Sequence, residues 1–242
     1  MRYALLSDIH GNLEALQAVV DEFSKHEVDE CLCLGDIVGY GADPKECIRT
    51  VQFLKPTAYV AGNHEWGVTG RLGLDYFNEN ARMALEWTQK ALDDNEIEYL
   101  KSFPLIYNND KFTIVHSSLE HPEEFPYVID KEDAFPTLNM MKTKICFLGH
   151  SHVGGIYYSD KEKIARFKDT KIKLDRGKKY VINVGSVGQS RDFDPRASFA
   201  VYDVDKNIVE IIRVDYDIKA AQGKILKAGL PARLASRLSS GT

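Results

Sequence analysis

The sequence predicts an α/β fold, and two observations on the pattern of apolar residues lead to that prediction. In the N-terminal half, short apolar runs of strand length alternate with segments whose apolar residues recur at helical spacing. From residue 155 to about residue 213, the apolar runs are mostly of strand length. Regular alternation of strands and helices favours an α/β core with parallel pairing.

The N-terminal elements follow from local signals in the sequence. The expected strands are 3–8, 30–36 and 57–63, and the expected helices are 13–23 and 43–54. Asn12 is placed to cap the first helix, in which Leu16 and Val19 recur at helical spacing. Pro44 falls in the first turn of the second helix, where proline is well tolerated.

The rest of the chain is expected to form a helical insertion followed by strands. Helical spacing from about residue 75 to residue 102 predicts an insertion of about 70–103. Strands are expected at 112–118, 143–152, 154–159, 171–175, 179–186, 197–204 and 207–214, with a hairpin turn at 203–207. Two short helices, broken at 229–231, are expected at the end. We therefore expect one domain over 1–216, with the helices of 217–242 packed on it.

Composition excludes several classes of protein. Of the 242 residues, 44% are apolar and 28% are charged, as in soluble globular proteins. No apolar run approaches the roughly 20 residues that a membrane span needs, so no membrane partner is expected. The apolar run at the N-terminus is too short for a signal peptide, which favours a cytoplasmic location. A net charge of −5 argues against duplex nucleic acid as a partner, although it leaves phosphate substrates open.

The four cysteines are expected to be small buried side chains rather than ligands or disulfides. Cys31, Cys33 and Cys146 fall in predicted strands, and Cys47 falls in a predicted helix. No CxxC pair is present.

Polar side chains repeatedly follow the predicted strands at their carboxyl ends. These side chains are Asp8, His10, Asp36, Asn63, His64, His116, His150 and His152. The carboxyl ends of strands line the ligand crevice of an open α/β sheet. Each residue alone is a weak signal, but five of the seven histidines occupy such positions. The pattern predicts a site at this edge of the sheet.

The residue types in this set indicate metal ions. Imidazole, carboxylate and amide groups suit Mn, Fe, Zn, Co or Ni, and thiolates are absent. Even seven ligands from these eight residues are too many for one small ion that keeps an open position, so two ions that share one carboxylate are expected. Two ions roughly 3.5–4 Å apart can clamp the attacking and leaving oxygens of a phosphoryl displacement.

Five motifs occur in an order that resembles a known family. "DIH", "GDIVGYG", "GNHE", a single histidine and "GHSH" run from Asp8 to His152, in the order found in the calcineurin-like metallophosphoesterase superfamily. The small bacterial and archaeal phosphodiesterase branch is the most similar part of that family. The resemblance implies a four-layer αββα sandwich of two mixed sheets, with a dimetal centre at the strand ends.

The resemblance also implies a role for each residue of the motifs. Asp8, His10 and His152 would bind the first ion, Asp36 would bridge, and Asn63, His116 and His150 would bind the second ion. His64 would not bind metal but would contact the phosphoryl group and protonate the leaving oxygen. Glu65 would either orient His64 or lie on the surface. Mn or Fe is favoured by the resemblance, while the oligomeric state is left open.

The implied activity is hydrolysis of a phosphate ester by a hydroxide that bridges the two ions. A phosphodiesterase acting on small or nucleotide substrates is favoured. Gly39 and Tyr40 replace the Asp-Arg that follows the bridging motif in protein phosphatases and in symmetric diadenosine tetraphosphatases, which disfavours protein phosphatase activity. Nucleotide pyrophosphatase activity, including dinucleoside polyphosphate hydrolysis, remains an alternative. A non-catalytic scaffold and a sensor with structural metals are less favoured, because His64 and every metal position are present.

Substrate contacts are harder to predict. Among Arg71, Arg82, Arg191 and Arg196, only Arg191 is favoured as a phosphate contact, since it lies in the "GSVGQSRDFDPR" loop. The others are expected to be surface or structural arginines. Trp66, Tyr76, Phe77 and Trp87 are expected to form an aromatic core between helices, with stacking on a substrate base as the alternative.

Overall fold

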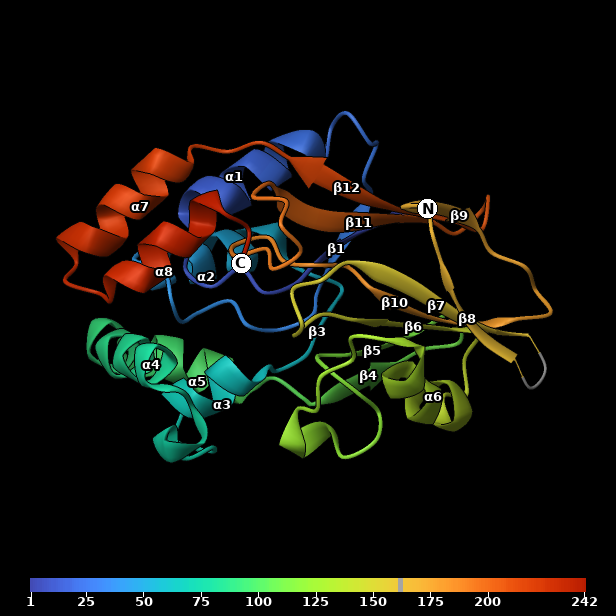
Figure 1. Ribbon diagram of the computed structural model, residues 1–242, viewed down its shortest axis with the longest axis horizontal. Coiled ribbons are helices and arrows are strands. Elements are labelled where there is room, and N and C mark those ends of the chain that lie inside the picture. Colours follow the sequence, from blue (N-terminus) through green and yellow to red (C-terminus); the bar gives the residue numbers. More distant parts are fainter. Residues whose placement is uncertain (161–162) are drawn as a thin grey trace.

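The strands of the protein form two six-stranded sheets that pack face to face (Figure 1). The computed structural model describes residues 1–160 and 163–242, and these counts refer to them. The first sheet has the order β3 (Ala58–Tyr59), β2 (Glu30–Cys33), β1 (Arg2–Leu6), β11 (Ala197–Asp203), β12 (Ile208–Val214) and β9 (Lys171–Lys173). The second has the order β4 (Ile106–Asn108), β5 (Thr113–Val115), β6 (Ile145–Leu148), β10 (Lys179–Asn183), β7 (Gly155–Asp160) and β8 (Lys163–Phe167).

Both sheets are mixed. Strands β1, β2 and β3 run parallel in the first sheet, and β5, β6 and β10 run parallel in the second. The other strand pairs in the two sheets are antiparallel, including β11 against β1 and β7 against β10. The expected parallel pairing therefore holds for three neighbouring strands in each sheet. Antiparallel strands complete the first sheet on one side of these strands and the second sheet on both sides.

Helices cover the outer faces of the two sheets and complete a four-layer αββα arrangement (Figure 1). The outer layers contain α1 (Leu13–Glu22) and α2 (Pro44–Leu54) over the first sheet, and α6 (Lys131–Met140) over the second. Further helices gather at one end of the sandwich, namely α3 (Asn63–Val68), α4 (Glu79–Ala91), α5 (Asp94–Lys101), α7 (Ile218–Lys227) and α8 (Ala232–Ser236). The predicted four-layer fold is confirmed.

Local signals account for the helices that the sequence predicted. The Asn12 side chain accepts a hydrogen bond from the Ala15 amide at 3.1 Å and caps α1. Pro44 occupies the first position of α2. Asn78 caps α4 in the same way as Asn12 caps α1, by accepting from the Ala81 amide.

Apolar side chains fill the space between every pair of layers. Leu5, Leu32, Ile114 and Phe147 are fully buried between the two sheets. All four cysteines are buried and free, as the sequence predicted. Such dry, close-packed layers hold the strand ends at fixed positions, which a site built from several strands requires.

The C-terminal helices pack against the helical end of the molecule. Leu230, Leu234 and Leu238 form one buried cluster with Ala84 of α4 and with Tyr40. The Lys224 ammonium group on α7 lies 2.6 Å from Glu14 of α1 and 2.8 Å from Asp43, just before α2. These contacts fix the 218–238 segment beside the loops that follow β1 and β2.

The structure also differs from the sequence prediction in several elements. The third strand is only two residues long, because the chain leaves the sheet after Tyr59. Helix α6 and strands β4 and β8 were not predicted. Helix α6 contains Pro136, and proline inside an apolar pattern normally argues against a helix. Among the described residues, no helix combines the length and the apolar character that crossing a membrane requires.

Candidate metal centre

The polar residues that follow the strands converge on one buried point. Asp8 and His10 follow β1, Asp36 follows β2, Asn63 and His64 begin α3, His116 follows β5, and His150 and His152 follow β6. Their exposed fractions lie between 0% and 6%, so all eight side chains are buried. Because β1 and β2 belong to the first sheet and β5 and β6 to the second, the two sheets share this cluster.

The backbone at these residues is unusual. Five of them have left-handed backbone conformations: Asp8 (φ 53°), His10 (φ 51°), Asp36 (φ 55°), His150 (φ 65°) and His152 (φ 59°). Each such conformation in a residue other than glycine costs on the order of 1–3 kcal/mol and persists only where its surroundings enforce it. Strain of this kind clusters at functional sites, and here it turns the chain sharply after each strand.

Gly149 allows the second sheet to approach the first at the site. A Cβ atom on this residue would lie 1.9 Å from Ser7 Oγ and 2.4 Å from an Asp8 carboxylate oxygen, which no larger residue tolerates. This close approach lets the His150 amide donate a hydrogen bond to Asp8 Oδ2 at 2.9 Å. Gly149 therefore permits the contact between the two sheets as well as the turn before the two histidines.

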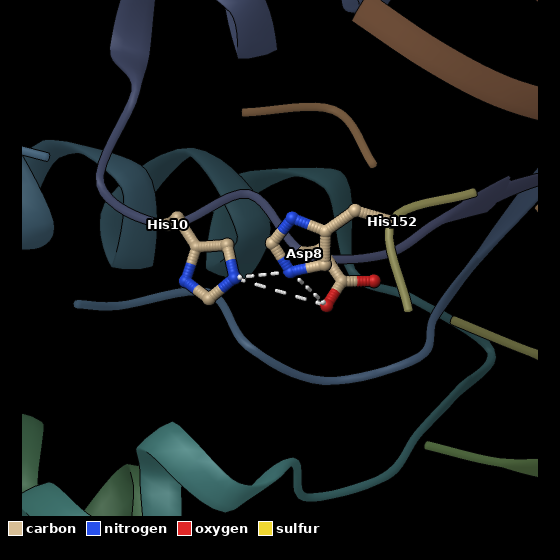
Figure 2. Close-up of side chains that lie close together, drawn as sticks. All are labelled: Asp8, His10 and His152. Carbon is tan, nitrogen blue, oxygen red and sulfur yellow. Dashed lines mark hydrogen bonds and ion pairs between the residues drawn. The ribbon is translucent and has the colours of Figure 1, made fainter. Parts of the chain in front are cut away.

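Asp8, His10 and His152 form the first of the possible metal-binding groups (Figure 2). His152 Nε2 lies 3.2 Å from Asp8 Oδ1, and His10 Nε2 lies 3.8 Å from the same oxygen. The two imidazole Nε2 atoms are 3.0 Å apart and face the same space (Figure 2). One carboxylate oxygen and two imidazole nitrogens thus point at a volume of atomic size.

Asp36, His116 and His150 form a second group of the same kind. His116 Nε2 lies 3.3 Å from Asp36 Oδ2, and His10 Nε2 of the first group lies 3.6 Å from that oxygen. Asp36 therefore lies between the two groups, where the resemblance places the bridging carboxylate. The geometry puts His150 with the second group and His152 with the first, although one residue separates them.

Backbone carbonyl oxygens orient three of the imidazole rings. Nδ1 of His10 contacts the Val38 carbonyl at 3.1 Å, Nδ1 of His116 contacts Leu34 at 2.6 Å, and Nδ1 of His152 contacts Gln189 at 2.5 Å. A carbonyl oxygen only accepts hydrogen bonds, so each Nδ1 carries the proton. In the neutral form of each ring, Nε2 is then left with a lone pair for a metal ion, which is the usual arrangement around metal-bound histidine.

Unpartnered buried atoms test whether these residues fit metal ions. Within the described residues, Asp8 Oδ1, Asn63 Oδ1, His116 Nε2 and His150 Nε2 are buried without a hydrogen-bond partner. Leaving each such atom unsatisfied costs about 1–3 kcal/mol. The mixture of nitrogen and oxygen atoms suits first-row transition metals. The residues present therefore fit metal ions in this cluster.

The electrostatics of the cluster also favour metal binding. Burial opposes ionisation of Asp8 and Asp36, but the neighbouring imidazoles outweigh it and lower the pKa of both carboxyl groups. Burial lowers the pKa of His150 to about 3. His116 is the exception, since Asp36 overcomes the effect of burial and raises the pKa of His116 to about 10. The protein thus holds two carboxylates at this point together with a protonated His116, and a bound metal ion would replace the Nε2 proton of His116 as the source of positive charge.

Glu65 neither orients His64 nor lies on the surface, so both expectations for it were wrong. Its side chain is fully buried and accepts hydrogen bonds from the Asp36 and Ile37 amides, both at 2.7 Å, and from the Gly62 amide at 2.8 Å. Burial and the charge of Asp36 raise the pKa of Glu65 to about 7. Glu65 therefore fixes the backbone that carries Asp36.

His64 lies at the edge of the cluster, against the loop that follows β2. Its ring packs edge-on against Tyr40, with ring centroids 4.5 Å apart, and its amide donates to Asp36 Oδ1 at 2.9 Å. One ring nitrogen also falls within 4.8 Å of His10 and Asp36 donor atoms, so the geometry alone permits metal binding by His64. Burial lowers the pKa of His64 to about 4, which leaves the imidazole neutral at pH 7.

Arg191 is the one arginine of the four candidates that the structure places beside the cluster. Its guanidinium donates to the Tyr40 hydroxyl at 3.3 Å, and its amide donates to the His152 carbonyl at 3.2 Å. Arg71 is exposed on the surface, Arg82 pairs with Glu86, and Arg196 pairs with Asp194.

The aromatic residues of the helical insertion mostly belong to the core. Trp66, Phe77 and Trp87 are partly buried against the apolar clusters. Tyr76 is 48% exposed, and its hydroxyl donates to the Glu124 carbonyl. The aromatic residue that sequence reasoning missed is Tyr127, whose ring stacks on His150 at 4.3 Å between centroids. No motif marks Tyr127, which lies in the connection between β5 and α6.

Comparison with known proteins agrees with this geometry. Residues 1–207 match the model of the calcineurin-like phosphoesterase superfamily domain. The chain is 40% identical over 244 residues to the uncharacterized protein MJ0912 of Methanocaldococcus jannaschii. The aligned residues cover 98% of this chain and 97% of that protein. It is 38% identical to a metallophosphoesterase from Sphaerobacter thermophilus, whose crystal structure superposes with a TM-score of 0.87 over 100% of both chains.

A more distant structure supports the fold alone. The hypothetical protein PH1004 from Pyrococcus horikoshii OT3 is 19% identical and has a TM-score of 0.82 over 100% of this chain and 98% of that chain. The family model, the relatives and the buried Asp and His groups at the strand ends all agree. The chain belongs to the calcineurin-like phosphoesterase superfamily.

Proposed function

We propose that the protein is a metal-dependent phosphodiesterase that acts on small or nucleotide substrates. In this proposal Asp8, His10 and His152 hold one ion, and Asn63, His116 and His150 hold a second, with Asp36 between them. The observation that carries the proposal is the convergence of buried, unpartnered donor atoms from the ends of both sheets. When bound, two such ions would acidify a water molecule and supply positive charge to phosphoryl oxygens.

The chain's own residues would position the substrate beside this centre. Arg191 is held by Tyr40 and by the loop next to His152, and its guanidinium suits a phosphoryl oxygen. A neutral His64 can donate an N–H hydrogen bond to the phosphoryl group. An approaching phosphate anion would raise the pKa of His64 above its value of about 4 and so increase the fraction of imidazolium, the form that can donate a proton to the leaving oxygen.

The presence of His64 favours a catalyst over a scaffold. A scaffold that had kept only the fold would have no need for a buried imidazole with an unpartnered Nδ1 beside the candidate metal groups. Tyr40 stands where the protein phosphatases of the family resemblance carry arginine, and Arg191 approaches Tyr40 from another loop. Protein phosphatase activity is therefore the weaker candidate, whereas pyrophosphate cleavage gains support from the pocket described below.

Hydrolysis of bis(p-nitrophenyl) phosphate with added Mn²⁺ tests the proposal. We expect turnover that chelation removes and that Asp36→Asn abolishes, because that change removes the carboxylate shared by the two groups. His121→Ala is a suitable control, since His121 is exposed and belongs to neither group. Lack of metal-dependent hydrolysis of any diester, monoester or nucleotide by the purified protein would overturn the proposal and favour a scaffold.

A further inference from the structure

A pocket of about 430 Å³ opens beside the candidate metal centre. Tyr40 and Tyr127 line it, and both rings pack on histidines of the centre. Tyr40 lies 4.4 Å from His10 between ring centroids, and Tyr127 lies 4.3 Å from His150. The volume falls within the range of about 300–1,000 Å³ that is typical of small-molecule sites. A molecule bound at the metal centre would therefore extend into this pocket.

Three arginines line the same pocket, and two of them come from the C-terminal segment. Arg191 lies in the loop after β10, Arg233 on α8, and Arg237 one helical turn further along the chain. Leu234, between the latter two, packs with Tyr40 and holds α8 against the rim. The Phe193 amide donates to the Gly241 carbonyl at 2.8 Å, which ties the Arg191 loop to the end of the segment.

None of these three guanidinium groups forms an ion pair with an Asp or Glu side chain of the described residues. Within the part of the chain that the structure describes, none of them lies within 4.0 Å of an Asp or Glu carboxylate. Arg237 Nε donates to the main-chain oxygen of Thr242, the C-terminal residue of the sequence, and Arg191 Nε is buried with no partner. Burial, and then repulsion from Arg191 and Arg233, lowers the pKa of Arg237. Positive charges gathered in this way favour the binding of an anion.

The charge of the pocket is opposite to that of the molecule. Its lining contains three arginines and one acidic residue, Glu79, whereas the whole chain has a net charge of −5. A surface that needed positive charge only for solubility would not concentrate it in the hollow beside a phosphoester site. Guanidinium groups bind phosphate oxygens in a bidentate manner, so a cluster of them suits a phosphate better than a neutral or singly charged group.

We propose that Arg191, Arg233 and Arg237 bind a second phosphate, next to the scissile one, so that the preferred substrates are nucleoside or dinucleoside polyphosphates. This inference rests on the proposed phosphoesterase function and narrows its substrate class. In the reaction, a P–O bond forms to the water oxygen and the P–O bond to the neighbouring phosphate breaks. The two protons of the water pass to the product phosphates or to solvent. The arginines would stabilise the negative charge on the neighbouring phosphate.

The test compares substrates with one phosphate and with several. The kcat/KM of the metal-loaded protein is measured for p-nitrophenyl thymidine 5′-phosphate, which has a nucleoside and one phosphate, and for diadenosine tetraphosphate. We expect the tetraphosphate to be preferred. The double change Arg233→Ala and Arg237→Ala should lower this preference about 100-fold, mainly through KM, at roughly tenfold for each lost charged contact.

Two controls keep the test specific. Arg176→Ala removes an exposed arginine outside the pocket and should leave the preference as it is in the unmodified protein. Replacing Arg233 and Arg237 by lysine instead of alanine should restore part of the preference for the tetraphosphate, which a merely structural role would not predict. If the enzyme hydrolyses the monophosphate ester but the double alanine variant keeps the preference, the inference is wrong and the proposed function stands. If neither substrate is hydrolysed, both are overturned.

Discussion

Gly39 lies against the His64 imidazole, and this contact explains why a glycine follows the candidate bridging residue. A Cβ atom on Gly39 would fall 2.1 Å from His64 Nδ1, and the backbone has a φ of +87°. We expect Gly39→Ala to displace the His64 ring and to lower kcat by about tenfold or more, since a small misplacement of a positioned group costs this much or more. The measurement is kcat with bis(p-nitrophenyl) phosphate, alongside metal content, which should not change.

Gly70 provides the matched control for this substitution. It has a φ of +75°, close to that of Gly39, but no atom lies within 4 Å of its hypothetical Cβ. Gly70→Ala therefore introduces the same kind of backbone strain without the clash. Equal losses of kcat in both variants would attribute the effect to strain, and the proposed positioning of His64 would be wrong.

His64 itself can be tested by separating metal binding from turnover. We expect His64→Ala to retain two metal ions per chain while kcat falls about 10²–10⁴-fold, the usual contribution of a general acid or base. Metal analysis of the purified variant distinguishes this role from ligation. Loss of one ion would instead make His64 a ligand, which its place in a group with His10 and Asp36 also allows.

At the scale of elements, Glu65 joins α3 to the end of β2. Its carboxylate accepts three backbone amide hydrogen bonds within the buried site. We expect Glu65→Ala to lower the free energy of unfolding by about 3 kcal/mol or more, because each buried amide left without an acceptor costs about 1–3 kcal/mol. Chemical denaturation measures this loss. Glu98→Gln, on the exposed face of α5, should cost no more than about 1 kcal/mol.

The elements that sequence reasoning recovered carry their information locally. Helix α1 has a cap at Asn12 and regular apolar spacing, and both work without the rest of the chain. Helix α6 has neither clear spacing nor a continuous hydrogen-bond ladder, because Pro136 interrupts it, and it forms through packing on the second sheet. Strand β3 is short because residues 60–62 leave the sheet to approach Asp36, a constraint that only the tertiary structure imposes.

The residues of the candidate site also divide into those that the sequence reveals and those that only the tertiary structure reveals. The strand-end residues were predictable because strand polarity alone brings carboxyl ends together, and the motif order then assigned each residue to a group. Glu65 was misjudged because its partners are backbone amides, which leave no mark in the sequence. Arg233 and Arg237 are four residues apart on one helical face, a spacing visible in the sequence. Their relevance depends on where α8 docks, which the spacing does not reveal.

At the scale of the whole molecule, the candidate metal centre lies where the two sheets meet. Asp8, His10 and Asp36 extend from the first sheet, and His116, His150 and His152 extend from the second. Direct contact between the sheets at this point includes the bond from the His150 amide to Asp8. No strand is shared between the two sheets in the described residues, so no backbone pairing of strands joins them. Ions held by both sets of residues would therefore link the two sheets at this point.

Metal removal should therefore destabilise the whole fold rather than the site alone. Ligand at 100 times its Kd stabilises a native protein by about 2.7 kcal/mol, which for a domain of this size corresponds to a rise in Tm of about 5–10 °C. We expect chelation to lower Tm by that amount and added Mn²⁺ to restore it, as measured by calorimetry. Asp36→Asn should remove most of the metal-dependent shift, whereas His121→Ala should keep it in full. A Tm that chelation leaves unchanged would mean that the ions do not link the two sheets, and the two-group assignment of the histidines would then have to be abandoned.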